Sequence, residues 1–254
     1  MSCCIIIKMR PHFSVVIPAF NEEKLLPRLL ESLDNQSYKD FEVILVDANS
    51  TDRTIEEAKN YIKKLSLTIF STDEKNVSAS RNFGASKAKG EFLFFIDADN
   101  YVHPAFLKDV SRLLEKGYQM IVPSIVPDSK NALYKFAYKV TNSLVYIGEK
   151  VHLSFSTGGN MVIAKEVFEK LHGFDKTIFV GEDHDIVERA RKKGFKVTFT
   201  FRSKVVFSVR RLEKEGGAVL LKYFFSTVYI VLFGKMTRKM YNYEMGGEYY
   251  KKES

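Results

Sequence analysis

The sequence contains little cysteine and no long hydrophobic run, and each shortage excludes a class of protein. The only two cysteines among 254 residues, Cys3 and Cys4, are neighbours. Neighbouring cysteines rarely bridge each other, so a disulfide framework is excluded and a reducing compartment is expected. The apolar stretch at residues 5–7 is short and follows no positive segment, which argues against a signal peptide.

The most apolar stretch, residues 218–234, has 13 apolar or aromatic residues out of 17 and contains Lys222. A membrane-spanning helix needs about 20 mostly apolar residues, so an interfacial or buried amphipathic helix is predicted here. Basic residues collect in the same region: residues 187–254 hold 16 lysines and arginines against six acids, whereas residues 1–186 hold 23 against 25. An apolar run in a basic region favours an anionic lipid surface over nucleic acid as the partner.

Strand-like and helix-like stretches alternate through the first half of the chain. Apolar segments at 13–17, 41–46, 67–70 and 92–96 predict strands, and helical patterns lie between them, with Glu22 and Glu23 placed in the first turn of the first helix. This alternation predicts an α/β fold with a mostly parallel sheet flanked by helices.

Beyond Tyr118 the alternation loosens. Residues 120–126 and 195–201 read as strands. The intervening segment 132–147 carries four aromatic residues and two lysines one turn apart, Lys135 and Lys139. It is predicted to be a core-packing helix whose lysine stems lie along apolar surface.

Carboxylates follow two of the predicted strands, Asp47 after the second and Asp97 and Asp99 after the fourth. The carboxyl ends of parallel strands meet at one edge of a sheet, where open α/β folds bind their ligands. Two acids one residue apart can share Mg²⁺ or Mn²⁺, which in turn suits a diphosphate. The alternative is a polar turn in which Asp97 caps the next helix.

A second acidic pair, Glu182 and Asp183, stands at the predicted start of a helix that runs to about residue 193. The helix dipole keeps such carboxylates ionised, and an ionised carboxylate can act as a general base. Asp185 and Arg189, four residues apart, are predicted to pair on this helix. Arg81 is predicted to meet a phosphate, with a surface ion pair as the alternative.

Taken in order, these motifs resemble family 2 glycosyltransferases of the GT-A fold. The resemblance rests on Val-Val-Ile-Pro-Ala-Phe-Asn-Glu-Glu (15–23), Val-Asp-Ala-Asn-Ser-Thr-Asp (46–52), Ser-Ala-Ser-Arg-Asn-Phe-Gly (78–84), Asp-Ala-Asp-Asn (97–100), Gly-Gly-Asn (158–160), Gly-Phe-Asp (173–175) and Glu-Asp (182–183). It covers about residues 13–211. A domain at residues 11–211 and a basic, apolar, amphipathic helical extension at 212–254 are therefore expected.

The resemblance implies a UDP- or GDP-linked sugar donor, a divalent metal (Mg²⁺ or Mn²⁺) and roles for the acids. It implies that Asp47 contacts the base, Asp97 the ribose or sugar and Asp99 the metal, and that Asp183, beside Glu182, is the base of an inverting transfer. Further donor-side residues are expected to be Pro18, Ala19, Asn21, Glu22, Ser80, Arg81, Ala98, Arg210 and Arg211, and acceptor-side residues Gly158, Gly159 and Asn160. The expected product is a glycan or lipid-linked glycan, made by a cytoplasmic protein lying on the inner face of the cell membrane.

Two departures from the family pattern modify this interpretation. Many relatives place a histidine after the Glu-Asp helix, but residues 205–211 contain none. Donor oxygens and water are expected to fill the metal shell instead, and Arg210 and Arg211 either meet the diphosphate or lie at the surface. The Gln-x-x-Arg-Trp element of processive synthases is absent, since the chain has no tryptophan, so transfer of one sugar is expected.

Three other functions remain open at this stage. A haloacid-dehalogenase-like phosphatase also uses Asp-x-Asp after a strand, but it wants Thr or Val where this chain has Tyr101, and three predicted strands precede the motif here. A non-catalytic nucleotide-sugar or glycan-binding module is a second alternative, but such a module does not need Asp97, Asp99 and Asp183, and their presence argues against it. A polyprenyl-phosphate sugar synthase uses an acceptor that is already anionic and needs no general base.

Overall fold

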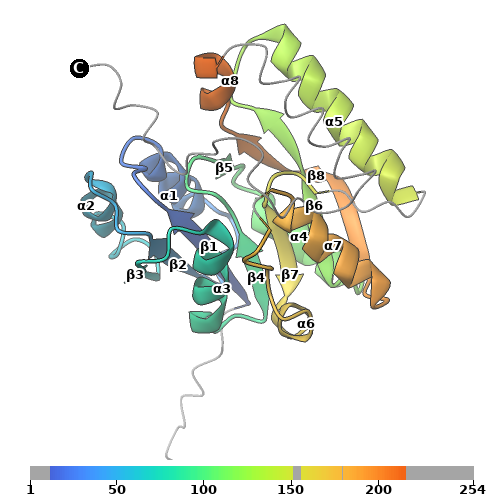
Figure 1. Cartoon of the computed structure of the whole chain (residues 1–254), viewed down its shortest axis with the longest axis horizontal. Coiled ribbons are helices and arrows are strands. Elements are labelled where there is room, and N and C mark those ends of the chain that lie inside the picture. Colours follow the sequence, from blue (N-terminus) through green and yellow to red (C-terminus); the bar gives the residue numbers. More distant parts are fainter. Residues whose placement is uncertain (1–11, 151–155, 179, 216–254) are drawn as a thin grey trace, which may run out of the picture.

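A single mixed sheet forms the centre of the computed structural model, which describes residues 12–150, 156–178 and 180–215. Its eight strands lie in the order β3-β2-β1-β4-β7-β6-β8-β5 (Figure 1). The strands are β1 (Phe13–Ala19), β2 (Phe41–Asp47), β3 (Leu67–Ser71), β4 (Phe92–Phe95), β5 (Tyr101–Val102), β6 (Met120–Pro127), β7 (Met161–Ala164) and β8 (Val197–Phe207).

The half of the sheet that ends in the candidate acids is parallel, as predicted. β1 lies between β2 and β4 and pairs with both in parallel, and β3 continues the parallel order beyond β2. All seven residues of β1 and of β2 are buried, because helices cover both faces and both faces need apolar side chains. The other half is mixed: β7 runs antiparallel to β4 and β6, and β8 is parallel to β6 but antiparallel to β5.

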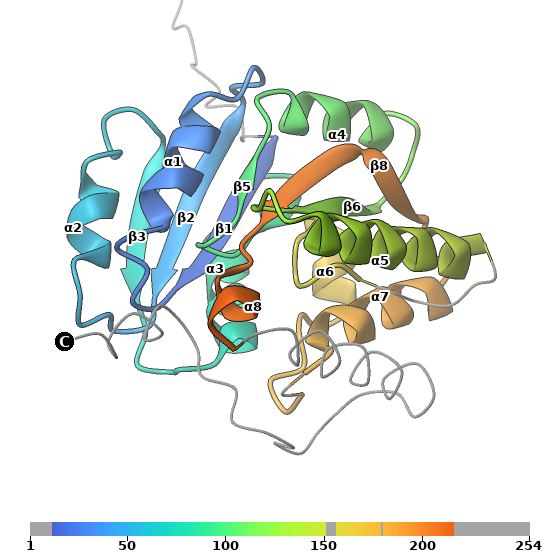
Figure 2. The same cartoon turned by 90° about the horizontal axis from the view of Figure 1, so that it is seen from above.

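Helices cover the two faces of the sheet through separate apolar clusters (Figure 2). On one face, Val15 and Ile17 of β1 pack with the leucines of α1 and the apolar side of α4. On the other, Val16 packs with residues of α3, α6 and α7, since successive strand residues point to opposite faces. The helices are α1 (Leu26–Asp34), α2 (Thr54–Lys59), α3 (Val77–Lys87), α4 (Phe106–Leu114), α5 (Ala132–Lys150), α6 (Lys165–Lys170), α7 (Glu182–Lys192) and α8 (Arg210–Glu215).

Some element boundaries differ from the sequence prediction. Glu22 and Glu23 precede α1, which begins at Leu26 with no acid in its first turn. Both acids have other partners, because Glu22 binds Arg210 and the Glu23 carboxylate accepts the Arg53 amide at 3.0 Å. The side chain of Asn76 caps α3 by accepting a hydrogen bond from the Ala79 amide. β8 extends past residue 201 to Phe207, because it pairs with β6 on both sides of an irregularity at Pro123 and Ser124 and also pairs with β5 near its end.

Helix α5 packs on the sheet as predicted, but through one side only. The helix contacts β6 and β8, but only Asn142, Val145 and Gly148 are buried, while Phe136 is 66% exposed. The sheet needs only one face of α5, and no described element covers the other. No described helix is long and apolar enough to cross a membrane; residues 218–234 lie outside the described residues.

Candidate active site

The loops that follow β1 and β2 are joined by side chains at the carboxyl edge of the sheet. Asn21 has a left-handed φ of 53°. Its backbone N–H donates to the Ser50 hydroxyl at 2.8 Å, and its side-chain oxygen accepts a hydrogen bond from the Thr51 backbone N–H at 2.8 Å. The Glu22 amide donates to Thr54 at 2.7 Å. These bonds fix the polar turn after β1 at the end of β2, which confirms the predicted convergence of the two loops.

Asp47 lies at the end of β2, opposite Ala19 of β1, and is 2% exposed. Its carboxylate accepts the backbone amide of Ser50 at 2.9 Å and also the Ser50 hydroxyl. Asp47 therefore shapes the loop after β2, as a loop-capping acid does, and its predicted contact with a nucleotide base stays a prediction.

A buried arginine joins the two acidic motifs of the sequence. Arg81 of α3 is 2% exposed, and its guanidinium donates to Asp97 at 2.7 Å and to Glu182 at 2.8 Å. These residues are 16 and 101 positions away along the chain. The sheet edge and the start of α7 are thereby held together, so Asp183 does not lie on the far side of the molecule from Asp97.

The surface ion pair considered for Arg81 is wrong, because the Arg81 side chain is buried. Burial alone lowers the pKa of the Arg81 guanidinium, but the charges and hydrogen bonds of Asp97 and Glu182 raise the pKa by more. Arg81 therefore stays charged and holds two carboxylates in place, one of which, Asp97, keeps 29% of its side chain exposed. Its contact with a phosphate stays a prediction.

Asp183 is held by a glycine turn. Gly158 and Gly159 both adopt left-handed φ angles, 77° and 78°, and both direct their amides at one Asp183 oxygen, at 3.1 and 3.0 Å. The other oxygen accepts the His184 amide at 3.0 Å. Burial raises the pKa of Asp183, but His184, the Gly159 amide, Arg81 and Ser156 outweigh it, so the pKa lies below its ordinary value. The carboxylate is thus ionised at neutral pH.

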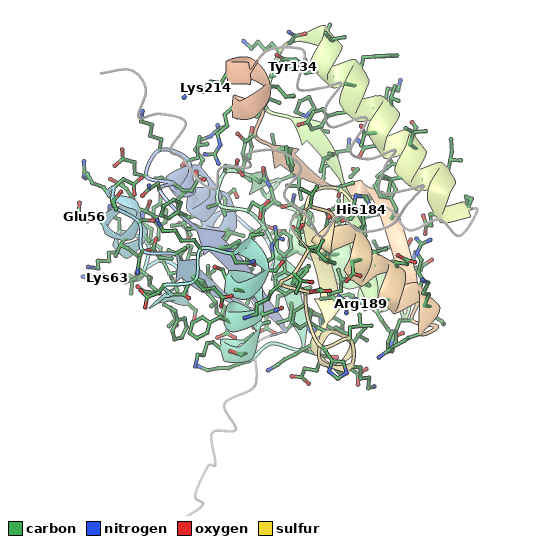
Figure 3. The ribbon with its side chains drawn as sticks, viewed as in Figure 1. Glu56, Lys63, Tyr134, His184, Arg189 and Lys214 are labelled. Atoms are coloured by element: carbon green, nitrogen blue, oxygen red, sulfur yellow. The ribbon has the colours of Figure 1, made fainter. Side chains whose placement is uncertain are left out.

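Glu182, the neighbour of Asp183, is shifted in the opposite direction. Burial and the Asp183 charge raise the pKa of Glu182, and Arg81 opposes them. Two adjacent acids with pKa values pushed apart are typical of sites that separate acid and base roles. Farther along α7, Arg189 binds Asp185 at 2.7 Å, which confirms the predicted pair. His184 and Arg189 are labelled on this helix in Figure 3.

Gly159 is required by a close approach to Arg81. A Cβ at Gly159 would lie 2.2 Å from the Arg81 Nη2 atom, whereas one at Gly194, with a similar φ of 81°, would meet nothing within 4 Å. Both alanine variants carry the strain of a left-handed residue, about 1 kcal/mol. We expect Gly159→Ala to lose at least about 2 kcal/mol more than Gly194→Ala in urea unfolding, because it also displaces a buried ion pair. Equal losses in the two variants would contradict the close approach.

Arg210, at the start of α8, closes the site from the C-terminal side. Its guanidinium donates two hydrogen bonds to the Glu22 carboxylate, both at 2.6 Å, and lies 3.0 Å from an oxygen of Asp99. Burial raises the pKa of Glu22 to about 7; Arg210 opposes this shift, and the Asp99 and Asp97 charges add to it. Arg210 therefore faces the acids and is not a surface residue. The side chain of Arg211 lies outside the described residues.

A divalent metal fits these acids only with help from a ligand. No group of three or more His, Cys, Asp or Glu side chains that could hold a metal occurs in the described ranges. Asp97 and Asp99 stand one residue apart with 29% and 19% of their side chains exposed. Magnesium is commonly bound by one or two carboxylates together with substrate phosphates and water, so the residues fit a metal that arrives with a diphosphate.

The remaining predicted residues surround this centre. Pro18 and Ala19 end β1, Ala98 is buried between the two acids, and Ser80 is buried on α3. Asn160 is fully buried and clamps the glycine turn by donating to the Gly158 carbonyl at 3.1 Å. These placements are at or beside the site, and the individual roles stay predictions.

One residue of the site was not singled out from the sequence. The Asn100 side chain donates to Asn160 at 3.2 Å and accepts the Ser208 amide at 3.1 Å. Asn100 thus joins the loop after β4, the glycine turn and the segment after β8. Its position directly after Asp99 was the available signal, but its partners are 60 and 108 positions away.

Comparison with known proteins gives a consistent result. The family described as "Glycosyl transferase family 2" matches residues 14–172, and the family described as "N-terminal domain of galactosyltransferase" matches residues 139–212. The chain is 34% identical over 114 residues to the Staphylococcus aureus poly(ribitol-phosphate) beta-N-acetylglucosaminyltransferase TarS, covering 43% of this chain and 20% of TarS. It is 26% identical over 203 residues to the Campylobacter jejuni GalNAc(5)-diNAcBac-PP-undecaprenol beta-1,3-glucosyltransferase, covering 78% of this chain and 65% of the relative.

Solved structures share the fold. S. aureus TarS residues 1–349 with UDP-GlcNAc superpose with a TM-score of 0.65 at 22% identity, covering 79% of this chain and 58% of that one. The mannosyltransferase PcManGT from Pyrobaculum calidifontis, with GDP-Man and Mn²⁺, gives a TM-score of 0.66 at 19% identity, covering 87% and 65%. The chain thus spans less than two thirds of each of these relatives. The fold is of the GT-A type, and the chain belongs to glycosyl transferase family 2.

Proposed function

We propose that this glycosyltransferase moves one sugar from a nucleotide diphosphate to an acceptor hydroxyl with inversion at the anomeric carbon. The observation that carries the proposal is the buried Arg81, which ties Asp97, on the donor side, to Glu182 at the start of α7. This tie supports the assignment of Asp183, the neighbour of Glu182, as the base of a site whose acids suit a diphosphate.

On the donor side, the chain supplies carboxylates and the guanidinium group of Arg210. Asp47 would bind the base of the nucleotide, and Asp97 the ribose or sugar. Arg210 is bound bidentately to Glu22 and contacts Asp99, and guanidinium groups recognise phosphate oxygens in the same two-pronged way. Arg210 is placed to exchange these carboxylates for the diphosphate. A Mg²⁺ or Mn²⁺ ion at Asp99 would act as a Lewis acid on the leaving diphosphate.

On the acceptor side, the reaction depends on Asp183. The acceptor hydroxyl gives its proton to the Asp183 carboxylate while its oxygen attacks the anomeric carbon, and the bond from that carbon to the diphosphate breaks. Attack from the side opposite the leaving group inverts the configuration. The amides of Gly158 and Gly159 hold one oxygen of the Asp183 carboxylate, so the carboxylate is already oriented before the acceptor binds.

The ionised Asp183 favours a hydroxyl acceptor over a polyprenyl phosphate, because a phosphate is already anionic and needs no base. The acceptor we propose is a glycan or a lipid-linked glycan, reached by a cytoplasmic protein that lies on the inner face of the cell membrane. The Campylobacter jejuni relative is named for a lipid-linked acceptor, and the basic, apolar region at 187–254 suits the surface of an anionic membrane.

A panel of UDP- and GDP-linked sugars tests the proposal. We expect one nucleotide sugar to be hydrolysed in the presence of Mn²⁺ or Mg²⁺, the activity to disappear with a chelator and to return when the metal is added back. The anomer released at early times, read by NMR, should be inverted. Retention of configuration would rule out the direct displacement, and binding of every donor without turnover would identify a non-catalytic module.

A further inference from the structure

Helix α5 is apolar on two opposite sides. Its inner side packs on the sheet through Asn142 and Val145. Its outer side carries apolar residues three or four positions apart, which places them in one stripe along the helix. The outer stripe consists of Leu133, Phe136, Val140, Leu144 and Ile147, each at least 41% exposed. A contiguous apolar patch exposed on the surface usually marks an interaction site, so the outer stripe calls for a partner.

The charge beside the outer stripe is positive. At 100° per residue, Lys139 and Lys150 follow one border of the stripe, and Lys135 lies slightly farther round. Residues 130–150 contain four lysines and a single acid, Glu149. In Figure 3, side chains project outward along the length of α5. An apolar stripe bordered by lysines is typical of helices that lie in the headgroup layer of an anionic membrane.

We propose that the outer stripe of α5 is a docking surface for an anionic membrane. The alternative occupant is residues 216–254, which follow α8 in the sequence, since the Tyr134 hydroxyl of α5 donates to the Leu212 carbonyl of α8 at 3.5 Å. Residues 216–254, however, hold six lysines and arginines against three acids. Two positively charged segments do not complement each other, but both fit the same anionic layer.

The inner side of α5, opposite the stripe, is connected to the proposed acceptor side of the active site. The ring of Tyr138, on α5, lies 6.0 Å from that of Phe207, and a Cβ at Gly158 would lie 2.8 Å from Phe207. Gly158 in turn binds Asp183. A membrane against α5 would therefore lie near the side from which the acceptor approaches; this consequence rests on the proposed function, whereas the docking surface itself does not.

A fluorescent label tests the docking surface in the full-length chain. Cys3 and Cys4 are changed to serine, and Val140→Cys carries an environment-sensitive dye. Ile62→Cys, at a residue that is 47% exposed and outside the stripe, is the matched control. We expect the Val140 label to emit as in water until vesicles of phosphatidylglycerol and phosphatidylcholine are added, and then to shift to the blue. Vesicles of phosphatidylcholine alone, and the Ile62 label, should give no shift.

Two other outcomes would overturn the proposal. A Val140 label that is already shielded without vesicles would show that this chain, or a second copy, covers the stripe. A label that never shifts would show that the stripe does not meet lipid. In vesicle flotation, Phe136→Ser combined with Leu144→Ser should weaken binding by about 100-fold, roughly tenfold for each side chain, and Ile62→Ser by less than about twofold. Unchanged flotation of the double variant would also overturn it. None of these measurements uses a sugar donor, so they fail or succeed independently of the proposed transfer.

Discussion

Replacing Asp183 by asparagine is expected to lower the rate of sugar transfer by about 10²–10⁴-fold, the usual contribution of a general base. The carboxylate that takes the acceptor proton is lost, while the donor-side acids are untouched. The effect should therefore appear in kcat, with the KM for the nucleotide sugar changed by less than about threefold. Steady-state kinetics with the donor identified by the nucleotide-sugar panel provide the measurement.

The design must separate chemistry from folding. In asparagine only the side-chain oxygen can accept a hydrogen bond, so it cannot accept from the amides of Gly158, Gly159 and His184 as both carboxylate oxygens of Asp183 do. A stability loss of about 1–3 kcal/mol is therefore expected as well. Urea unfolding measures this loss, and the kinetics are taken where the variant is fully folded. Glu188→Gln, also on α7 but at a side chain that is 47% exposed, is the control and should keep normal transfer. Near-normal transfer by Asp183→Asn would remove the base from the proposed mechanism.

Replacing Arg81 by methionine is expected to destabilise the fold by about 3–5 kcal/mol and to abolish transfer. The substitution keeps an apolar side chain of similar length but leaves the carboxylates of Asp97 and Glu182 without the cation that compensates them, which is the costly way to break a buried ion pair. Urea unfolding at neutral pH measures the loss. The loss should shrink at lower pH, because carboxylates can then take up protons in place of the missing charge.

An exposed ion pair of equal length is the control for Arg81. Arg28 binds Asp128 at 2.7 Å with 46% of its side chain exposed, so Arg28→Met should cost no more than about 1 kcal/mol. Adding Asp97→Asn and Glu182→Gln to Arg81→Met removes the unpaired charges and should restore part of the stability but none of the activity. A small loss in Arg81→Met, or no recovery in the triple variant, would show that burial of the ion pair is not what makes Arg81 important.

The parts of the prediction that succeeded depend on patterns local in the chain. The apolar runs of β1 and β2 predicted strands, and the parallel order followed from the helices between them. The positions of Asp47, Asp97 and Asp99 at strand ends were enough to place them at one edge, because parallel strands share the direction of their carboxyl ends. The i, i+4 pair of Asp185 and Arg189 is equally local.

The parts that failed depend on partners far away in the sequence. Nothing near Arg81 reveals that it is buried, and nothing near Glu22 announces that Arg210, 188 positions later, will bind it and keep it out of α1. For α5, the four aromatic residues predicted a core-packing helix, but only one side of the helix is buried. An apolar face is buried only if another element of the fold is available to cover it. The number of available elements is a property of the whole fold.

The amino-acid sequence by itself determined the α/β architecture, the family and the acids at the edge of the sheet. The periodicity of strands and helices and the order of the motifs are local properties that can be read from neighbouring residues. Only the tertiary structure decided that Arg81 binds both acidic motifs, that two glycine amides hold Asp183, and that α5 keeps an apolar side exposed. Charge pairing and burial depend on distance in space, and folding brings together residues that lie up to 188 positions apart in the sequence.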